Sequence, residues 1–226
     1  MDALTPDDLY EERNGVSYAR PILQGDVFED VIVPGLGDTP LTVQVVMHPC
    51  SMRRGVQLVQ RIQVAPVGAY EKVGDWDRHL RVMPLPDLRE DGKHYAAQFL
   101  DTTAVPASSL TLENRIASLS RQGILVLQQR IVKDHARLDL PLNLFLEQSA
   151  PVLTEAEMQE SWVEAALGVA TALNAADVEV AATDFQNWLD EEEGRRRKAL
   201  ESDLNHADLR REVRTAASER RAQMSR

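Results

Sequence analysis

The chain has 226 residues, of which 43% are hydrophobic and 27% are charged, and its formal net charge is −11 at pH 7. This length and composition are typical of a globular protein that buries its own core, and they exclude a disordered chain. The negative charge argues against a surface built for duplex DNA, because phosphate binding depends on clustered Lys and Arg.

The single cysteine, Cys50, excludes an intramolecular disulfide and a zinc site made of several cysteines. The histidines at positions 79, 94, 135 and 206 have no metal-ligand spacing. No apolar run approaches the roughly 18 residues that cross a bilayer, and the acidic beginning of the sequence differs from a signal peptide. We therefore expect a cytoplasmic protein without membrane contact, metal or other cofactor.

The first predicted elements are three β-strands. Two segments rich in Val and Ile, residues 26–33 and 41–47, flank the turn sequence PGLGDTP, and this arrangement predicts a β-hairpin. Residues 55–67 alternate between apolar and polar side chains. We expect this third strand to pair with the second one.

Residues 68–95 are charged and rich in Gly and Pro, which predicts a long loop. Two short strands are expected at 95–100 and 110–119, and helical spacing follows over 120–138. Several short strands closed by one helix favour an α+β fold, in which a small barrel or rolled sheet carries a helix on its flank.

The pattern after residue 150 is helical. Thr154 with Glu157, and Thr183 with Gln186, have the spacing of capping boxes and predict two helix starts. The second helix is expected to reach the C-terminus with only a thin apolar stripe, so it gains little from burial within its own chain. Either this helix frays or a partner covers the stripe, which consists of Leu200, Leu204, Leu209 and Val213.

These patterns together predict three parts of the chain. A polar N-terminal arm covers residues 1–18, and a small β-barrel domain covers residues 19–150. A helical extension covers residues 151–226, and its distal part is a long charged helix.

Four motifs occur in a recognisable order between residues 20 and 138. They are QGDVFEDVIVP, PLTVQVVMH, RIQVAPV and LENRIASLSRQGILVLQQRI. This region resembles the MazF/PemK family of toxin-type small β-barrels from prokaryotic toxin–antitoxin modules, with three strands, a late strand and a helix in matching order. The resemblance implies a MazF/PemK-like barrel acting in a toxin–antitoxin or phage-defence type assembly.

The chain departs from this family at the residues associated with RNA cleavage. The family's arginine at the start of the second strand corresponds to Thr39, and its threonine at the end of the third strand corresponds to Val67. Attack by a 2′-hydroxyl needs a base and a cation or acid, and neither residue supplies them. We therefore expect a non-catalytic interaction protein whose C-terminal helices dock another protein or a second copy.

The alternative is a diverged endoribonuclease that cleaves single-stranded RNA with a rewired site made of His48, Arg53 and Arg61. His48 and Cys50 are two residues apart and can share one face of a strand, as a thiol nucleophile and its base would require. We favour the other interpretation of Cys50, a buried cysteine at a strand end, which is the usual place of a free cysteine. The residues expected at the rim of a ligand or RNA site are Arg53, Arg54, Trp76 and His79.

Overall fold

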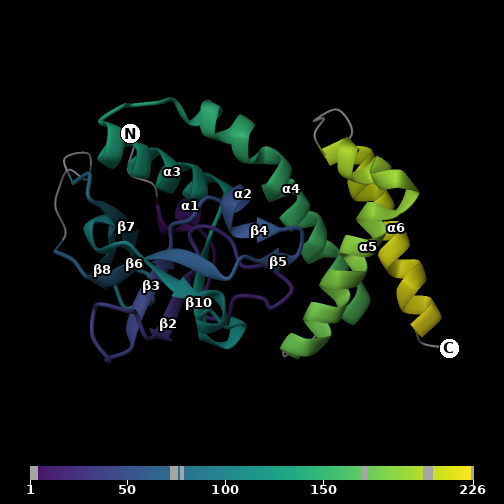
Figure 1. Ribbon diagram of the computed structural model, residues 1–226, viewed down its shortest axis with the longest axis horizontal. Coiled ribbons are helices and arrows are strands. Elements are labelled where there is room, and N and C mark those ends of the chain that lie inside the picture. Colours follow the sequence, from purple (N-terminus) through teal and green to yellow (C-terminus); the bar gives the residue numbers. More distant parts are fainter. Residues whose placement is uncertain (1–4, 72–75, 77–78, 169–172, 201–205, 225–226) are drawn as a thin grey trace. The chain divides into compact units, whose positions relative to one another are not determined.

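The computed structural model describes residues 5–71, 76, 79–168, 173–200 and 206–224, and shows a mixed α/β protein with a curled antiparallel sheet and C-terminal helices (Figure 1). The expectation of strands followed by helices is confirmed at this level.

The chain divides into two compact units. The β unit comprises Met1–Val16, Ile22–Met52 and Leu58–Gln148. The helical unit comprises Ser17–Pro21, Arg53–Gln57 and Ser149–Arg226, so it includes two short segments from the N-terminal half.

The β unit is built on one eight-stranded sheet in which every pair is antiparallel. The order is β1-β10-β2-β3-β6-β8-β7, and β9 also pairs with β6. These strands are β1 (Tyr10–Arg13), β2 (Val27–Val31), β3 (Leu41–Val45), β6 (Arg61–Ala69), β7 (Val82–Pro86), β8 (His94–Gln98), β9 (Thr103–Pro106) and β10 (Arg115–Leu119). A separate pair consists of β4 (Arg53–Arg54) and β5 (Gln57–Leu58).

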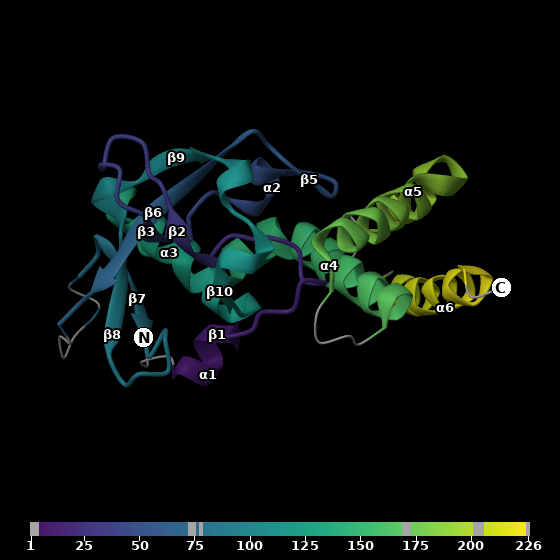
Figure 2. The same cartoon turned by 90° about the horizontal axis from the view of Figure 1, so that it is seen from below.

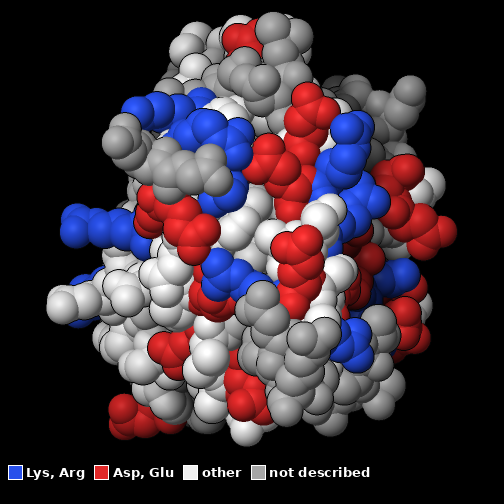
Figure 3. Space-filling view, turned by 90° about the vertical axis from the view of Figure 1, so that its right-hand side faces the viewer, with Lys and Arg blue, Asp and Glu red and all other residues white. Residues whose placement is uncertain are grey.

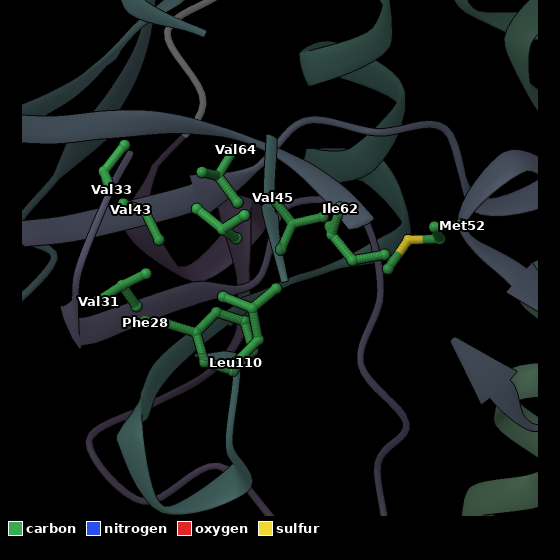
Figure 4. Packing of buried hydrophobic residues seen from close by; sticks show 10 residues of the cluster. Phe28, Val31, Val33, Val43, Val45, Met52, Ile62, Val64 and Leu110 are labelled. Atoms are coloured by element: carbon green, nitrogen blue, oxygen red, sulfur yellow. The ribbon is translucent and has the colours of Figure 1, made fainter. Parts of the chain in front are cut away.

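The predicted hairpin is confirmed, because β2 pairs with β3 across a turn that contains Gly35 and Gly37. Both glycines have a positive φ, 89° and 107°, a backbone conformation that other residues rarely adopt. The predicted pairing of the third strand with β3 is also confirmed. Figure 4 shows the apolar side chains of these strands, among them Phe28, Val43 and Ile62, directed toward one another in the core. Full burial of each such side chain contributes roughly 1.5–3 kcal/mol.

Side chains near the two edge strands, β1 and β7, link these strands to each other. Nη1 of Arg13 donates to the Asp87 carbonyl at 2.7 Å and lies 3.2 Å from its carboxylate. Nδ2 of Asn14 donates to Glu90 at 2.8 Å. The turn after β7 therefore lies beside the end of β1 (Figure 2). Edge position also explains why β7 tolerates Pro84, which offers no N–H to a neighbouring strand.

The prediction of a single loop over residues 68–95 is wrong, because β6 reaches Ala69 and β7 occupies Val82–Pro86. The predicted strand over 110–119 is shorter than expected, since the 3-10 turn η4 (Leu112–Asn114) precedes β10. Strand β9 was not predicted. Two further 3-10 turns, η2 (Phe99–Asp101) and η3 (Ala107–Ser109), flank it.

A buried ion pair lies inside the β unit. The side chains of Asp26 and Arg115 are both fully enclosed, with Arg115 Nη1 3.0 Å from Asp26 Oδ2. The same carboxylate accepts a hydrogen bond from the Ser118 hydroxyl at 2.7 Å and from the Leu23 amide at 3.1 Å. These hydrogen bonds offset part of the cost of removing the charges from water, so the group has a structural role.

Helix α3 (Arg121–Ala136) confirms the helix predicted over 120–138, and it packs beside β10 and β7. Ser120 caps its N-terminus by accepting a hydrogen bond from the Gly123 amide at 3.0 Å. Arg137 ends it in the left-handed conformation, with φ 57°. The short helices α1 (Pro6–Leu9) and α2 (Pro49–Met52) complete the β unit.

The helical unit contains α5 (Ala175–Leu200), α6 (His206–Met224) and α4 (Leu142–Leu167) from Ser149 onward. Its core surrounds three aromatic rings, Trp162, Phe185 and Trp188, whose centroids lie 5.2–6.1 Å apart. The two predicted helix starts are wrong. Thr154 is buried inside α4, and the Thr183 hydroxyl lies inside α5, where it donates to the Glu179 carbonyl at 2.8 Å.

The expectation that the apolar stripe of the last helix frays or needs a partner is also wrong for the described residues. Leu200, Leu209 and Val213 are only 4%, 2% and 1% exposed, and they pack in the aromatic core of the helical unit. Leu204 lies outside the described residues. The stripe is therefore covered by α4 and α5 of the same chain.

Charged side chains of the helical unit pair across its helices. Arg195 lies 3.0 Å from Glu212, Arg197 lies 3.4 Å from Glu155, and Arg210 lies 3.0 Å from Glu157. On the face in Figure 3, side chains of both signs are interspersed. Each surface pair contributes about 0–1 kcal/mol, less than the roughly 1.5–3 kcal/mol of a fully buried large apolar side chain. Among the described helices, none combines the length and apolar character needed to span a bilayer.

Candidate functional site

The two positions predicted to correspond to the MazF/PemK cleavage residues carry no catalytic group. Thr39 is exposed in the turn before β3, and Val67 lies in β6 opposite Thr42. Neither side chain can take a proton from a 2′-hydroxyl or stabilise a phosphoryl charge. A nuclease of this chain would have to use other residues.

His48 and Cys50 are neighbours, but they do not form an activated thiol. Nδ1 of His48 accepts a hydrogen bond from the Cys50 backbone amide at 3.3 Å, and burial lowers the pKa of the imidazole. Cys50 is exposed in α2, so the expectation that it is buried is wrong. Although the residue reaches solvent, partial desolvation raises the pKa of its thiol. A raised pKa reduces the thiolate fraction, whereas a nucleophile needs the opposite.

The three arginines of the predicted site lie in different surroundings. Arg61 is exposed at the start of β6 and donates to the Ala104 carbonyl at 2.8 Å. Arg53 belongs to the helical unit, where its Nη2 donates to Gln159 at 2.7 Å. Arg54 is exposed in the same segment. Arg53 therefore contributes to the structure of the helical unit, while Arg61 belongs to the β unit.

The structure does bring Trp76 and His79 together, and it adds Tyr70 at the end of β6. The Tyr70 and Trp76 rings have centroids 5.6 Å apart and are tilted by 32°. The His79 ring lies edge-on to both, and its Nδ1 is 3.1 Å from the Tyr70 hydroxyl. Aromatic pairs at these separations stabilise each other by about 0.5–1.5 kcal/mol, so the three rings form one cluster.

This cluster borders a pocket of about 280 Å³ in the β unit, which we name the aromatic–arginine pocket. Its lining residues are Tyr70, His79, Leu80, Arg81, Val82 and Arg137. Arg81 and Arg137 are exposed. Within the described part of the chain, neither guanidinium has a hydrogen bond or an ion pair. The pocket thus combines aromatic rings with two cations that can bind an anion.

A buried arginine of α3 holds the segment that carries these residues. Arg130 is 6% exposed, and its Nε donates to the Val82 carbonyl at 2.8 Å. Its Nη2 donates to the carbonyls of His79 at 2.6 Å and Trp76 at 3.2 Å. One side chain therefore positions the backbone on both sides of Arg81.

Trp76 and His79 were predicted as site residues from the sequence, whereas Tyr70, Arg81 and Arg137 were not. Tyr70 and Arg81 flank the charged segment in which Trp76 and His79 lie, and this closeness in the sequence is the signal that indicates them. Arg137 follows α3 and offers no local signal. Its position in the pocket depends on the packing of α3 beside β7.

Metal chemistry has no support from side-chain clusters. Among the residues that the structure describes, no group of three or more His, Cys, Asp or Glu side chains is arranged to hold a metal ion.

No family model matches the chain, and no curated protein matches it. The MazF/PemK resemblance therefore stays a prediction.

Proposed function

We propose that this chain is a binding protein that holds one nucleotide of single-stranded RNA in the aromatic–arginine pocket. The observation that carries this proposal is the composition of a single pocket, which is lined by Tyr70 and His79 together with Arg81 and Arg137. Aromatic rings can stack on a base, and guanidinium groups can bind a phosphate, so the pocket offers groups for both parts of a nucleotide.

The pocket fits a nucleotide in chemistry and in size. Unpaired bases stack on aromatic side chains, and each such contact contributes about 1–3 kcal/mol. Guanidinium groups bind phosphate oxygens through paired N–H donors. The volume of about 280 Å³ is at the lower end of ligand pockets, so it suits one nucleotide rather than a longer strand.

The proposal extends to the biological setting that the resemblance implies. The curled antiparallel sheet followed by α3 supports a MazF/PemK-like barrel, and this likeness supports a role in a toxin–antitoxin or phage-defence assembly. Because Leu200, Leu209 and Val213 are buried, a protein partner or second copy would contact the charged outer surface of the helical unit instead of this stripe.

A second candidate function is RNA cleavage at the same pocket, and the position of His79 favours it. His79 can act as the base for a 2′-hydroxyl, while Arg81 and Arg137 stabilise the phosphoryl charge. The oxygen would attack the adjacent phosphorus and the bond to the 5′-oxygen would break. Products of this step are a 2′,3′-cyclic phosphate and a new 5′-hydroxyl end.

Both candidates can be tested with fluorescently labelled single-stranded RNA of mixed sequence. The pocket variant is Arg81→Gln/Arg137→Gln, and the matched control is Arg54→Gln/Arg61→Gln, which removes the same charge from exposed positions. In anisotropy titrations, we expect the pocket variant to bind at least about tenfold more weakly than the wild type and the control to change less than about twofold.

The same samples are then run on a denaturing gel. Intact RNA in the presence of saturating wild-type protein supports binding without cleavage. Cleavage that disappears in a His79→Ala variant supports the nuclease instead. If the wild type binds no RNA, or if the control loses as much affinity as the pocket variant, the pocket is not an RNA site.

A further inference from the structure

We infer that the aromatic–arginine pocket recognises a nucleoside monophosphate, either free or as the 5′-phosphorylated end of an RNA strand. This inference rests on the proposed function and makes it more specific. It specifies that the phosphate of the bound nucleotide is a terminal monoester and not an internal diester.

The positive charge of the pocket favours a phosphate monoester. Arg81 and Arg137 supply two positive charges, and neither is neutralised by an ion pair within the described residues. A phosphate monoester has a charge of about −1.5 to −2 at pH 7, whereas an internal phosphodiester has a single negative charge. Two guanidinium groups in one small pocket therefore match the monoester better.

The two arginines of the pocket come from different elements of the β unit. Arg81 directly precedes β7, while Arg137 ends α3 in the left-handed conformation, and its amide donates to the Lys133 carbonyl at 3.1 Å. The two cations thus reach one pocket from separate elements that the fold holds in place. A phosphate bound by both would be contacted from two directions, as a terminal group with three free oxygens allows.

His79 offers a third group for the ligand. Its Nδ1 is already 3.1 Å from the Tyr70 hydroxyl, so Nε2 is the ring nitrogen that remains for a bound molecule. When the hydroxyl donates to Nδ1, Nε2 carries the proton and becomes a donor. The pocket then provides N–H donors for the phosphate next to the ring of Tyr70, on which a base can stack.

The test compares two RNA strands of identical sequence that differ only at the 5′ end. Each strand has ten nucleotides and a fluorophore at its 3′ end, and the 5′ end is either phosphorylated or a free hydroxyl. Each exposed guanidinium contact is expected to improve affinity about threefold, so the phosphorylated strand should bind the wild type about tenfold more tightly. Arg81→Gln/Arg137→Gln should bind both strands equally, and the control Arg54→Gln/Arg61→Gln should keep the tenfold difference.

Competition separates the two sources of the ligand. Adenosine monophosphate should displace the phosphorylated strand, while adenosine and inorganic phosphate at the same concentration should not. If RNA binds through the pocket but the two strands bind equally, the inference is wrong and the proposed function stands. If adenosine monophosphate binds through the pocket but RNA does not, the inference holds for a free nucleotide and RNA binding is wrong. If inorganic phosphate competes as strongly as adenosine monophosphate, the pocket does not recognise the nucleoside and the inference is wrong. If neither RNA nor adenosine monophosphate binds, both proposals are wrong.

Discussion

Replacing Arg130 by methionine should release the segment that carries His79 and Arg81 from α3. The guanidinium donates to three carbonyls at 2.6–3.2 Å, and the side chain is only 6% exposed, so water screens these bonds little. A hydrogen bond from a charged donor contributes roughly 1.5–3 kcal/mol. Because carbonyls that swing outward regain water, the three bonds do not add, and we expect a net loss of about 3 kcal/mol in the stability of this segment.

The loss should be local, because the segment is attached to the sheet through β7 and can open without unfolding the β unit. Amide hydrogen exchange at residues 80–82 should accelerate about 100-fold, which corresponds to about 3 kcal/mol. Nucleotide affinity should fall at least about tenfold in the same variant, since His79 and Arg81 lose their fixed positions.

The matched control is Lys133→Met on the same helix. Its Nζ forms an ion pair with Asp139 at 3.1 Å that is exposed on the Asp139 side, so this change should cost less than about 1 kcal/mol and leave the pocket unchanged. If Arg130→Met keeps both the exchange rates and the nucleotide affinity within about twofold of the wild type, Arg130 does not position the pocket.

Three further experiments test the buried ion pair, the packing at the start of α3 and the reactivity of Cys50. Asp26→Asn removes the carboxylate that faces the enclosed Arg115 guanidinium and should lower the free energy of unfolding by about 3–5 kcal/mol in urea titrations; a loss below about 1 kcal/mol would contradict the structural role. Gly123→Ala should lower the melting temperature although alanine favours helix by about 1 kcal/mol, because the new Cβ would lie 2.2 Å from the Leu9 carbonyl oxygen. The raised pKa of Cys50 predicts a smaller thiolate fraction at pH 8, so its alkylation by iodoacetamide should be slower than that of a cysteine in an unstructured, terminally blocked peptide, and the rate should keep rising above the usual thiol pKa; an equal or faster rate than the peptide would show an activated thiol.

The central strands could be predicted because their signals are local. In the β2–β3 hairpin, the apolar residues and the turn glycines lie within a few positions of each other, and the strands have partners on both sides. Strand β7 could not be predicted in the same way, because Pro84 and Pro86 are typical of loops. An edge strand tolerates them, but only the sheet order reveals which strand is at the edge.

The helix starts were mispredicted because a capping box describes only local compatibility. For α5 the cap is Asn174, whose Oδ1 accepts a hydrogen bond from the Ala176 amide at 3.0 Å. Thr183 lies two turns further on, and burial of Phe185 in the aromatic core keeps the helix continuous there. Helix α4 likewise continues through Pro151. The starts of α4 and α5 therefore depend on tertiary packing, which a four-residue capping motif does not encode.

The proposed binding of an anionic ligand has to be compatible with the acidic charge of the chain. The net charge of −11 repels a long polyanion at a distance, but at physiological salt the screening length is only about 8 Å. Distant carboxylates then contribute little, whereas Arg81 and Arg137 act at contact distance within the pocket. The affinity of a basic RNA-binding surface increases with each phosphate that it contacts. In this chain, the affinity would come from the base and the phosphate that enter the pocket. Affinity should therefore depend on the bound nucleotide and its phosphate, and hardly on the length of the strand attached to it.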